Sequence, residues 1–427
     1  MVHHTMNNSK TSAPSASSKS KDMSVWNLEK RKGRERPHTA VTARAGRLAL
    51  AALIVGSLAA CAIDPQPYPQ PAPVVGAPSD DGPLPPALQR GKSRWTPVRW
   101  AELPGWGQDN LHEAWNAWIK GCERPAPAGM PGQAALCTEV RQLSIGAPEA
   151  QRDWVVRRFQ PYRVTEADGN LPQGLLTGYY EPILPASRTP TATHRTPLYG
   201  PPAGLGSGQK WFTRQEIDTL PAAQAALQGK AIAWLADPVD ALVLQIQGSG
   251  RLNLNEADGA QRQVRVAFAG HNGHPYQSVG RWLLDQGAIR EGSWDAIRAW
   301  VRANPGRVND LLWSNPRTVF FKEVPLNALD AQFGPAGAQG VALTPGRSIA
   351  VDPQSIPYGT PVWLATQGAA LNQQKLVMAQ DTGGAIVGAV RADLFTGWGT
   401  WSDPAYTLAA SLKQPLQLWV LWPRQGL

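Results

Sequence analysis

Residues Lys375–Gly399 read K-L-V-M-A-Q-D-T-G-G-A-I-V-G-A-V-R-A-D-L-F-T-G-W-G. The apolar run from Leu376 to Ala379 has the length and composition of a buried strand that ends at Asp381. A Thr-Gly-Gly turn follows, where glycine tolerates left-handed backbone angles and lets a large ligand approach the main chain. A second short apolar run leads to Asp393. The stretch predicts two carboxyl groups beside exposed glycines, a setting in which partial desolvation raises a carboxyl pKa and suits it to acid–base chemistry on a sugar.

Either aspartate alone also fits a purely structural role, because Asp accepts hydrogen bonds from its own turn. Resemblance favours the catalytic interpretation. The stretch resembles the "3D" segment, named for its three aspartates, of the membrane-bound lytic murein transglycosylase A family. Five further segments resemble that family: Leu175–Pro182, Val243–Leu252, Tyr276–Leu283, Asn315–Glu323 and Arg347–Pro361.

The resemblance implies a fold that is mainly β with some α: a double-psi β barrel with an inserted, smaller β-rich domain and a substrate groove between the two. Irregularly connected strands in the C-terminal half also favour a closed barrel. The expected organisation is a leader with a lipoprotein signal peptide (1–60), a flexible tether (61–92), the first part of the barrel (93–185), the inserted domain (186–338) and the second part of the barrel, the 3D domain (339–427).

The resemblance also implies the reaction. A lytic transglycosylase cleaves the β-1,4 bond between N-acetylmuramic acid and N-acetylglucosamine of peptidoglycan and forms a 1,6-anhydro product. Asp393 is the implied acid/base, while Asp381 and Asp352 tune it or orient its partners. No cofactor is implied, and cell-wall synthesis complexes are the partners expected besides the glycan strands.

Two segments carry the residue types of a glycan groove. Thr177, Tyr179, Tyr180 and Glu181 combine a hydroxyl, aromatic rings and a carboxylate at an expected strand end, although the same residues suit an ordinary strand terminus. Residues 241–247 are expected to form a strand that presents Gln245 and Gln247 on one face. The Gly-rich turn after it brings Ser249 and Arg251 close to a ligand.

Two other functions remain open. Asp381-Thr382-Gly383 matches the D-T-G of aspartic proteases, but these need two copies of the motif sharing one proton, and no second D-T-G or D-S-G occurs. A non-catalytic glycan-binding outer-membrane lipoprotein could use the same groove.

The positive charge belongs to the leader. The chain carries a formal charge of +9, but residues 1–60 hold 10 of the 41 Lys and Arg and only 3 of the 32 Asp and Glu, which leaves +2 for the remainder. This distribution excludes a nucleic-acid-binding function.

An uncharged, mostly apolar run from Leu48 to Ala60 would span roughly 20 Å as a helix, short of the ~30 Å core of a bilayer, so it is predicted to be a signal peptide. Leu58-Ala59-Ala60-Cys61 resembles a lipobox. This predicts a lipid-anchored protein on the periplasmic face of the outer membrane, with an ordinary secretory signal as the alternative.

Cys122 and Cys137 are expected to pair in an oxidising periplasm, with two free thiols as the alternative. His271 and His274 form H-x-x-H across an expected turn rather than a helix, so no metal site is predicted. With 42% hydrophobic residues and 18 Trp, the chain can bury a large core. An amphipathic helix is expected from Asp109 to about Gly121, with Trp115 and Trp118 facing that core.

Overall fold

The computed structural model describes residues 82–424 except positions 126, 128, 207 and 208. The predictions for the leader, for Cys61 and for most of the tether therefore concern residues outside the described part of the chain. Among the described helices, none has the length and apolar character needed to cross a bilayer.

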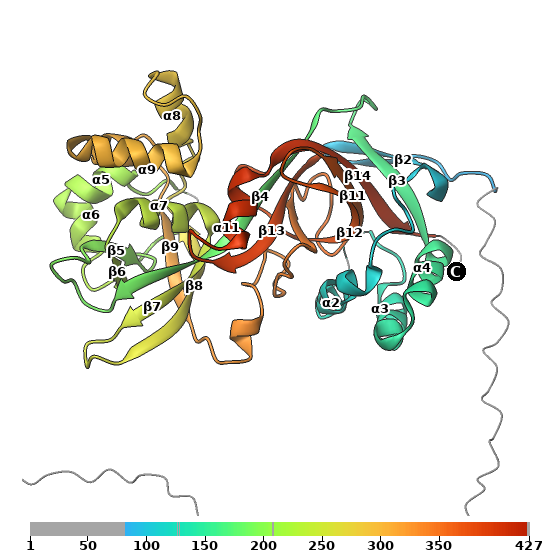
Figure 1. Ribbon diagram of the computed structural model, residues 1–427, viewed down its shortest axis with the longest axis horizontal. Coiled ribbons are helices and arrows are strands. Elements are labelled where there is room, and N and C mark those ends of the chain that lie inside the picture. Colours follow the sequence, from blue (N-terminus) through green and yellow to red (C-terminus); the bar gives the residue numbers. More distant parts are fainter. Residues whose placement is uncertain (1–81, 126, 128, 207–208, 425–427) are drawn as a thin grey trace, which may run out of the picture. The chain divides into compact units, whose positions relative to one another are not determined.

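Six strands hydrogen-bond to one another in a closed ring (Figure 1). Around the ring the order is β4, β13, β10, β12, β11, β14 and back to β4. The neighbours β10 and β12 run parallel, as do β13 and β4, and the other four pairs are antiparallel. The strands are β4 (Gly174–Ser187), β10 (Ser348–Val351), β11 (Pro361–Gln367), β12 (Asn372–Asp381), β13 (Arg391–Gly399) and β14 (Lys413–Pro423).

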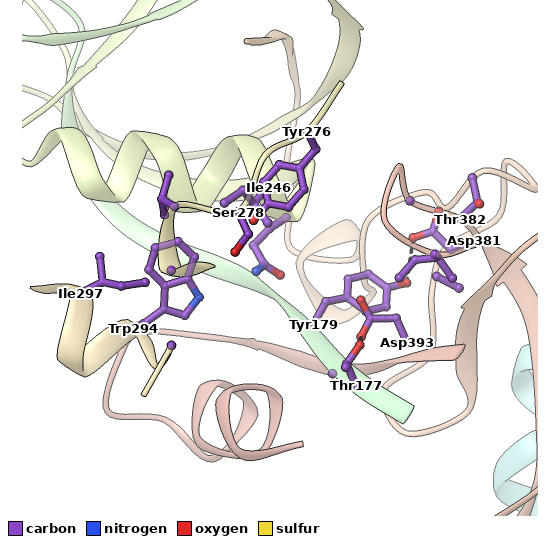
Figure 2. A pocket seen from close by; sticks show the side chains of 18 residues that line it. Thr177, Tyr179, Ile246, Tyr276, Ser278, Trp294, Ile297, Asp381, Thr382 and Asp393 are labelled. Carbon is purple, nitrogen blue, oxygen red and sulfur yellow. Dashed lines mark hydrogen bonds between the residues drawn. The ribbon is translucent and has the colours of Figure 1, made fainter. Parts of the chain in front are cut away.

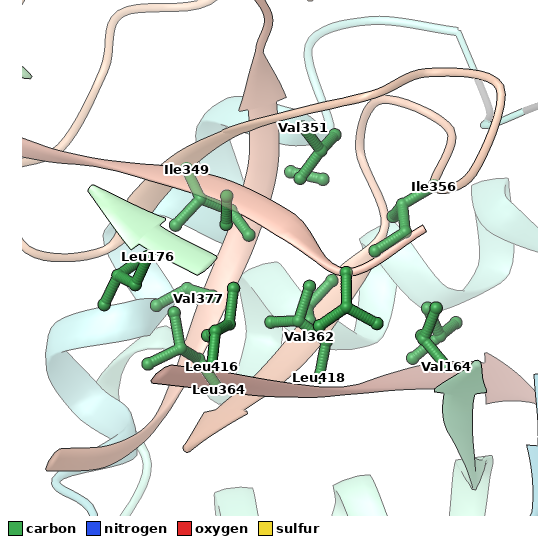
Figure 3. Close-up of a cluster of buried hydrophobic side chains, with 14 of the residues drawn as sticks. Val164, Leu176, Ile349, Val351, Ile356, Val362, Leu364, Val377, Leu416 and Leu418 are labelled. Atoms are coloured by element: carbon green, nitrogen blue, oxygen red, sulfur yellow. The ribbon is translucent and has the colours of Figure 1, made fainter. Parts of the chain in front are cut away.

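Several ring strands are buried on both faces, which explains their continuous apolar sequences. Along β11, Val362 and Leu364 belong to a core inside the ring, whereas the alternate residue Trp363 packs against helices outside it (Figure 3). In β12, Val377 lies in the inner core and its two neighbours in the outer one. Each fully buried Val or Leu contributes roughly 1.5–3 kcal/mol, so the two cores together hold the ring closed.

The outer core is rich in tryptophan. Trp115 and Trp118 on α2 are buried in it, as expected, and Trp154 meets both rings edge to face. Cys122 and Cys137 form a disulfide across this layer. Its helices are α2 (Leu111–Gly121), α3 (Gln133–Gln142) and α4 (Pro148–Arg158), with the 3-10 turns η1 (Trp100–Glu102) and η2 (Leu143–Ile145).

The sheet continues beyond the ring at β14 through β3 (Phe159–Glu166), β2 (Ser93–Pro97) and β1 (Leu88–Arg90). β1 lies inside the stretch predicted to be a tether, so ordered chain begins earlier than predicted. The reason is local: Leu88 packs on the inner core, and the Arg90 guanidinium stacks on Trp95 and Trp422.

β4 leaves the ring and continues into a second sheet (Figure 1). There it runs parallel to β7, which pairs in turn with β8 and β9. The strands of this sheet are β5 (Thr196–Tyr199), β6 (Ala231–Leu235), β7 (Ser249–Asn255), β8 (Gln261–His271) and β9 (Val319–Val324). Its helices and turns are α5 (Arg214–Thr219), α6 (Pro221–Ala226), α7 (Pro238–Gln247), α8 (Val279–Asp285), α9 (Trp294–Ala303), η3 (Pro305–Arg307), α10 (Val308–Trp313) and η4 (Asp330–Gln332). α11 (Pro404–Ser411) returns to the ring strands β13 and β4.

The predicted strand over residues 241–247 is wrong, because this segment is the helix α7. The Asp237 side chain accepts a hydrogen bond from the Val239 amide, and Pro238 occupies the first turn, so the helix starts firmly. Gly248 ends it in the left-handed conformation. The helix is buried over most of its surface, which removes the polar face that would have shown a helical period.

Candidate active site

Strand register brings the two candidate carboxyl groups to one face of the ring. Asp381 ends β12, Asp393 is the third residue of β13, and both pair with Ala350 on the intervening strand β10. On the other neighbour of β13, strand β4, Thr177 lies opposite Asp393. Residues opposite one another on neighbouring strands have side chains on the same face, so these four form one row. Ala350, which has a small side chain, lines a cavity next to this row and leaves space between the two carboxyl groups.

Asp393 has one oxygen engaged. The Thr177 hydroxyl donates to its Oδ1 over 2.6 Å, and Arg391 Nη2 donates to the same hydroxyl over 2.8 Å (Figure 2). Burial, helped by nearby Asp381, raises the pKa of Asp393 to about 6 against the lowering effects of Thr177 and Arg391. A carboxyl group with this pKa is partly protonated near neutral pH and can both give and take a proton.

Asp381 has both oxygens engaged. Its Oδ2 accepts from the Tyr179 hydroxyl over 2.7 Å, and its Oδ1 accepts from the Ala338 amide over 2.9 Å. Burial raises the pKa of Asp381, and these hydrogen bonds oppose the rise. Burial and the adjacent carboxylates hold the pKa of Tyr179 well above its usual range, so the phenol keeps its proton and donates.

Two cavities meet at these carboxyl groups. One has a volume of about 360 Å³ and the other about 590 Å³. Asp381, Asp393, Tyr179 and Gln247 line both of them, so they are two halves of one groove with Asp393 at the junction. Each half has residues of the ring on one wall and residues of the second sheet and its helices on the other.

The two halves differ in charge. The smaller one, which we call the neutral half, is lined by Tyr276, Ser278, Trp294 and Ile297 facing the carboxyl groups (Figure 2). Aromatic rings and a hydroxyl suit the faces and hydroxyl groups of a pyranose. The larger one, the basic half, is lined by four basic side chains in addition to the shared residues: Arg214, His271, Arg317 and Lys322.

The structure places seven of the sequence-predicted site residues on the groove: Asp381, Asp393, Thr177, Tyr179, Gln245, Gln247 and Ser249. The two glutamines reach it from the C-terminal turn of α7, not from a strand. Gln245 Oε1 accepts from Arg214, and Gln247 Oε1 accepts from the Tyr180 amide. These contacts orient both side chains before any ligand binds.

Four other predicted site residues are buried and do not line the groove: Tyr180, Glu181, Arg251 and Asp352. Glu181 accepts from Arg251 and Arg265 in an ion-paired cluster where β4 enters the second sheet. The ring of Tyr180 packs between Trp401 and Tyr406. Strand alternation explains the difference, because Tyr179 and Tyr180 point to opposite faces of β4.

Asp352 is the fourth of these residues. It pairs with Lys92 and accepts from the amides of Gln354 and Gly388, which lower its pKa against the effect of burial. Its environment is that of a turn-stabilising carboxylate, and it lines neither cavity of the groove.

Sequence reasoning missed Arg391, Tyr276, Trp294 and the basic residues of the groove. Arg391 could have been found, since it precedes Asp393 by two residues and therefore shares its face of the strand. Tyr276 lies just before α8 and Trp294 begins α9, both between β8 and β9, and no local pattern distinguishes them from core aromatics.

Comparison with known proteins gives a consistent picture. Residues 175–322 match the family model for the MltA specific insert domain, and residues 347–422 match the 3D domain. The membrane-bound lytic murein transglycosylase A of Vibrio cholerae is 31% identical over 289 residues, which cover 63% of this chain and 73% of that protein. The crystallised lytic transglycosylase LtgG of Burkholderia pseudomallei is 41% identical, with a TM-score of 0.53 over 80% of this chain and 100% of that one. MltA from Neisseria gonorrhoeae is 29% identical, with a TM-score of 0.64 over 81% and 96%.

Proposed function

The chain belongs to the family of membrane-bound lytic murein transglycosylases A, and from this premise we propose that it is a lyase that cleaves the β-1,4 bond between N-acetylmuramic acid and N-acetylglucosamine in peptidoglycan. A single residue, Asp393, acts as acid and then as base. The observation that carries this proposal is a half-buried carboxyl group at the junction of a two-sided groove, with a raised pKa and only one oxygen committed.

In the first step, protonated Asp393 donates its proton to the glycosidic oxygen, and the bond from that oxygen to C1 of the muramic acid breaks. In the second step, the C6 hydroxyl of the same muramic acid attacks C1, and its proton passes to the Asp393 carboxylate. The 1,6-anhydro bond forms, no water is consumed, and the acid is regenerated. The Thr177 hydroxyl, which itself accepts from Arg391, keeps Oδ1 occupied, so Oδ2 is the oxygen that exchanges the proton.

Asp381 suits a supporting role. A glycoside hydrolase needs two working carboxylates, separated by roughly 5–5.5 Å in retaining enzymes or roughly 6.5–9.5 Å in inverting ones. Both oxygens of Asp381 already accept hydrogen bonds, which disfavours its use as a nucleophile or base. The aspartic-protease alternative requires two carboxyl groups that share one proton, whereas Asp381 and Asp393 lie on strands separated by β10 and bond to different partners.

We also propose that the ring is a double-psi β barrel built from residues 93–185 and 339–427, with residues 186–338 inserted as a second domain. Two parallel pairs in a closed six-stranded ring support the barrel. Separate hydrophobic cores at the two ends of β4 support the division. Acylation of Cys61 at the outer membrane completes the proposal, since the relatives are described as membrane-bound.

The test is mass spectrometry of the products released from purified sacculi. Anhydro-muropeptides, one water lighter than hydrolysis products, are expected from the wild type. Hydrolysis products would place the protein among the hydrolases, and binding without any release would support the non-catalytic alternative.

A further inference from the structure

The groove is asymmetric in charge about Asp393. Among the described residues that line the neutral half, none is Lys, Arg or His. The basic half carries the cations Arg214, Arg317 and Lys322 beside His271, whose pKa burial and Arg317 lower, and among the described residues its lining carboxyl groups are Asp381 and Asp393 at the junction. A glycan backbone of N-acetylated sugars is neutral, so it does not account for cations on one side alone.

Arg317 is a cation without an anionic partner in the described part of the chain. Its Nη1 donates to the His274 carbonyl over 3.1 Å, and no carboxylate lies in salt-bridge range. Burial alone lowers the pKa of Arg317. A partly desolvated guanidinium with unused donors binds a planar carboxylate favourably, because the two groups match in bidentate geometry.

Lys322 lines the same half of the groove as Arg317. It pairs with Ala267 of β8, and Ala267 pairs with Ser249 of β7, so the three form a row across the sheet, and each lines the basic half. Lys322 is exposed and forms no ion pair within residues 82–424. Below them, Arg214 donates to the carbonyls of Asn315 and Arg317, which fixes the backbone that presents the Arg317 side chain.

We propose that the basic half of the groove binds the stem peptide of the substrate through its carboxylates, with Arg317 and Lys322 as the residues that select for it. This inference rests on the proposed function and names the part of the substrate that this half of the groove takes. The stem peptide is attached to the lactyl group of N-acetylmuramic acid and carries free carboxylates along its length. The neutral half then holds sugars without contributing to charge selection.

The test uses Arg317→Gln, Lys322→Gln and the double variant that carries both substitutions. The control is Lys230→Gln, because Lys230 is exposed and lines neither cavity. The substrates are peptide-bearing glycan strands and the same strands after amidase treatment, which keep only the lactyl carboxylate. For peptide-bearing strands, the KM of Arg317→Gln and of the double variant is expected to rise roughly tenfold to hundredfold, as for the loss of a charge-assisted contact. For treated strands, kcat/KM should stay within about twofold of wild type. Added salt should reduce the wild-type preference for peptide.

A binding experiment separates failure of this inference from failure of the proposed function. Asp393→Asn protein is titrated with amidase-released stem peptides whose carboxylates are free or amidated, which needs no turnover. Preference for the free acids, lost in the double variant but kept in Lys230→Gln, supports the site. Equal binding of both peptides overturns the inference. An equal loss of kcat/KM on peptide-bearing and treated strands also overturns it, because the cations would then bind the lactyl group. Peptide selection without any anhydro product would overturn the proposed reaction and leave the anion site standing.

Discussion

At the scale of single residues, Asp393 and Asp381 differ in the number of oxygens left for chemistry. Asp393→Asn keeps the size of the side chain and an acceptor for Thr177, but it can neither donate nor accept the reacting proton. Because one group serves both steps, the loss of anhydro-muropeptide release should reach or exceed the upper end of roughly 10²–10⁴-fold. Asp381→Asn should cost less. Product release from sacculi by the two variants is the measurement.

Sacculus pull-down by the same variants is the control, since the groove and its glycan contacts should survive both substitutions. Near-wild-type release from Asp393→Asn would exclude it as the acid. A larger loss at Asp381 would exchange the two roles.

The raised pKa of Asp393 also predicts a change in stability. Its folded-state pKa of about 6 exceeds the ordinary value of 3.8 for an Asp side chain, so the stability that comes from its protonated form is lost as pH rises through 6. Asp393→Asn removes that penalty. We expect the inactive variant to be more stable than wild type at pH 7, by up to about 3 kcal/mol, with the gain shrinking toward pH 4. Thermal denaturation at both pH values measures this, and a variant less stable than wild type at pH 7 would contradict it.

Local sequence and the family resemblance together indicated part of this candidate site. The sequence shows the two aspartates beside glycines and predicts Thr177 and Tyr179 near a strand end, and the family resemblance favoured all four; in the structure they line one groove. Glu181 looked equally suitable for ligand, and nothing in its neighbourhood indicates that Arg251 and Arg265, far along the chain, neutralise it in a buried cluster.

At the scale of elements, the ring closes where β4 meets β14, and Gly174 marks the contact. A Cβ at this position would lie 2.2 Å from the Leu416 carbonyl oxygen, which is main chain and cannot rotate away. Gly174→Ala should therefore destabilise the fold by roughly 1–3 kcal/mol or more. Urea denaturation measures the loss.

Gly306→Ala is the matched control, because a Cβ there meets nothing within 4 Å. Equal stability of the two variants would mean that β4 and β14 can separate at this point without cost.

Element types were predictable where one face is exposed, and less so where burial is complete. The amphipathic helix expected from Asp109 to about Gly121 is present as α2. α7 was predicted as a strand because a helix buried on most sides shows neither a polar face nor a helical period. The capping residues Asp237 and Gly248 indicate a helix, but the apolar run between them favoured a strand.

At the scale of the whole molecule, anchoring should be separable from catalysis. Cys61→Ala removes the proposed acylation site, and lipid chains contribute about 0.8 kcal/mol per buried methylene, so the variant should move from the membrane to the soluble fraction. Its activity on isolated sacculi should be unchanged, because Asp393 and its partners do not depend on the anchor. Recovery of the variant in the membrane fraction would argue against the lipobox.

The continuity of β4 has a kinetic consequence. This strand belongs to the ring and to the second sheet without a break, and the Glu181–Arg251–Arg265 cluster locks the crossing, with both arginines also donating to the Phe333 carbonyl. A continuous strand held by buried ion pairs should resist bending at this crossing. We therefore expect a glycan chain to bind in the groove in one bimolecular step. The observed association rate should grow linearly with ligand concentration, without the plateau that a conformational change would produce.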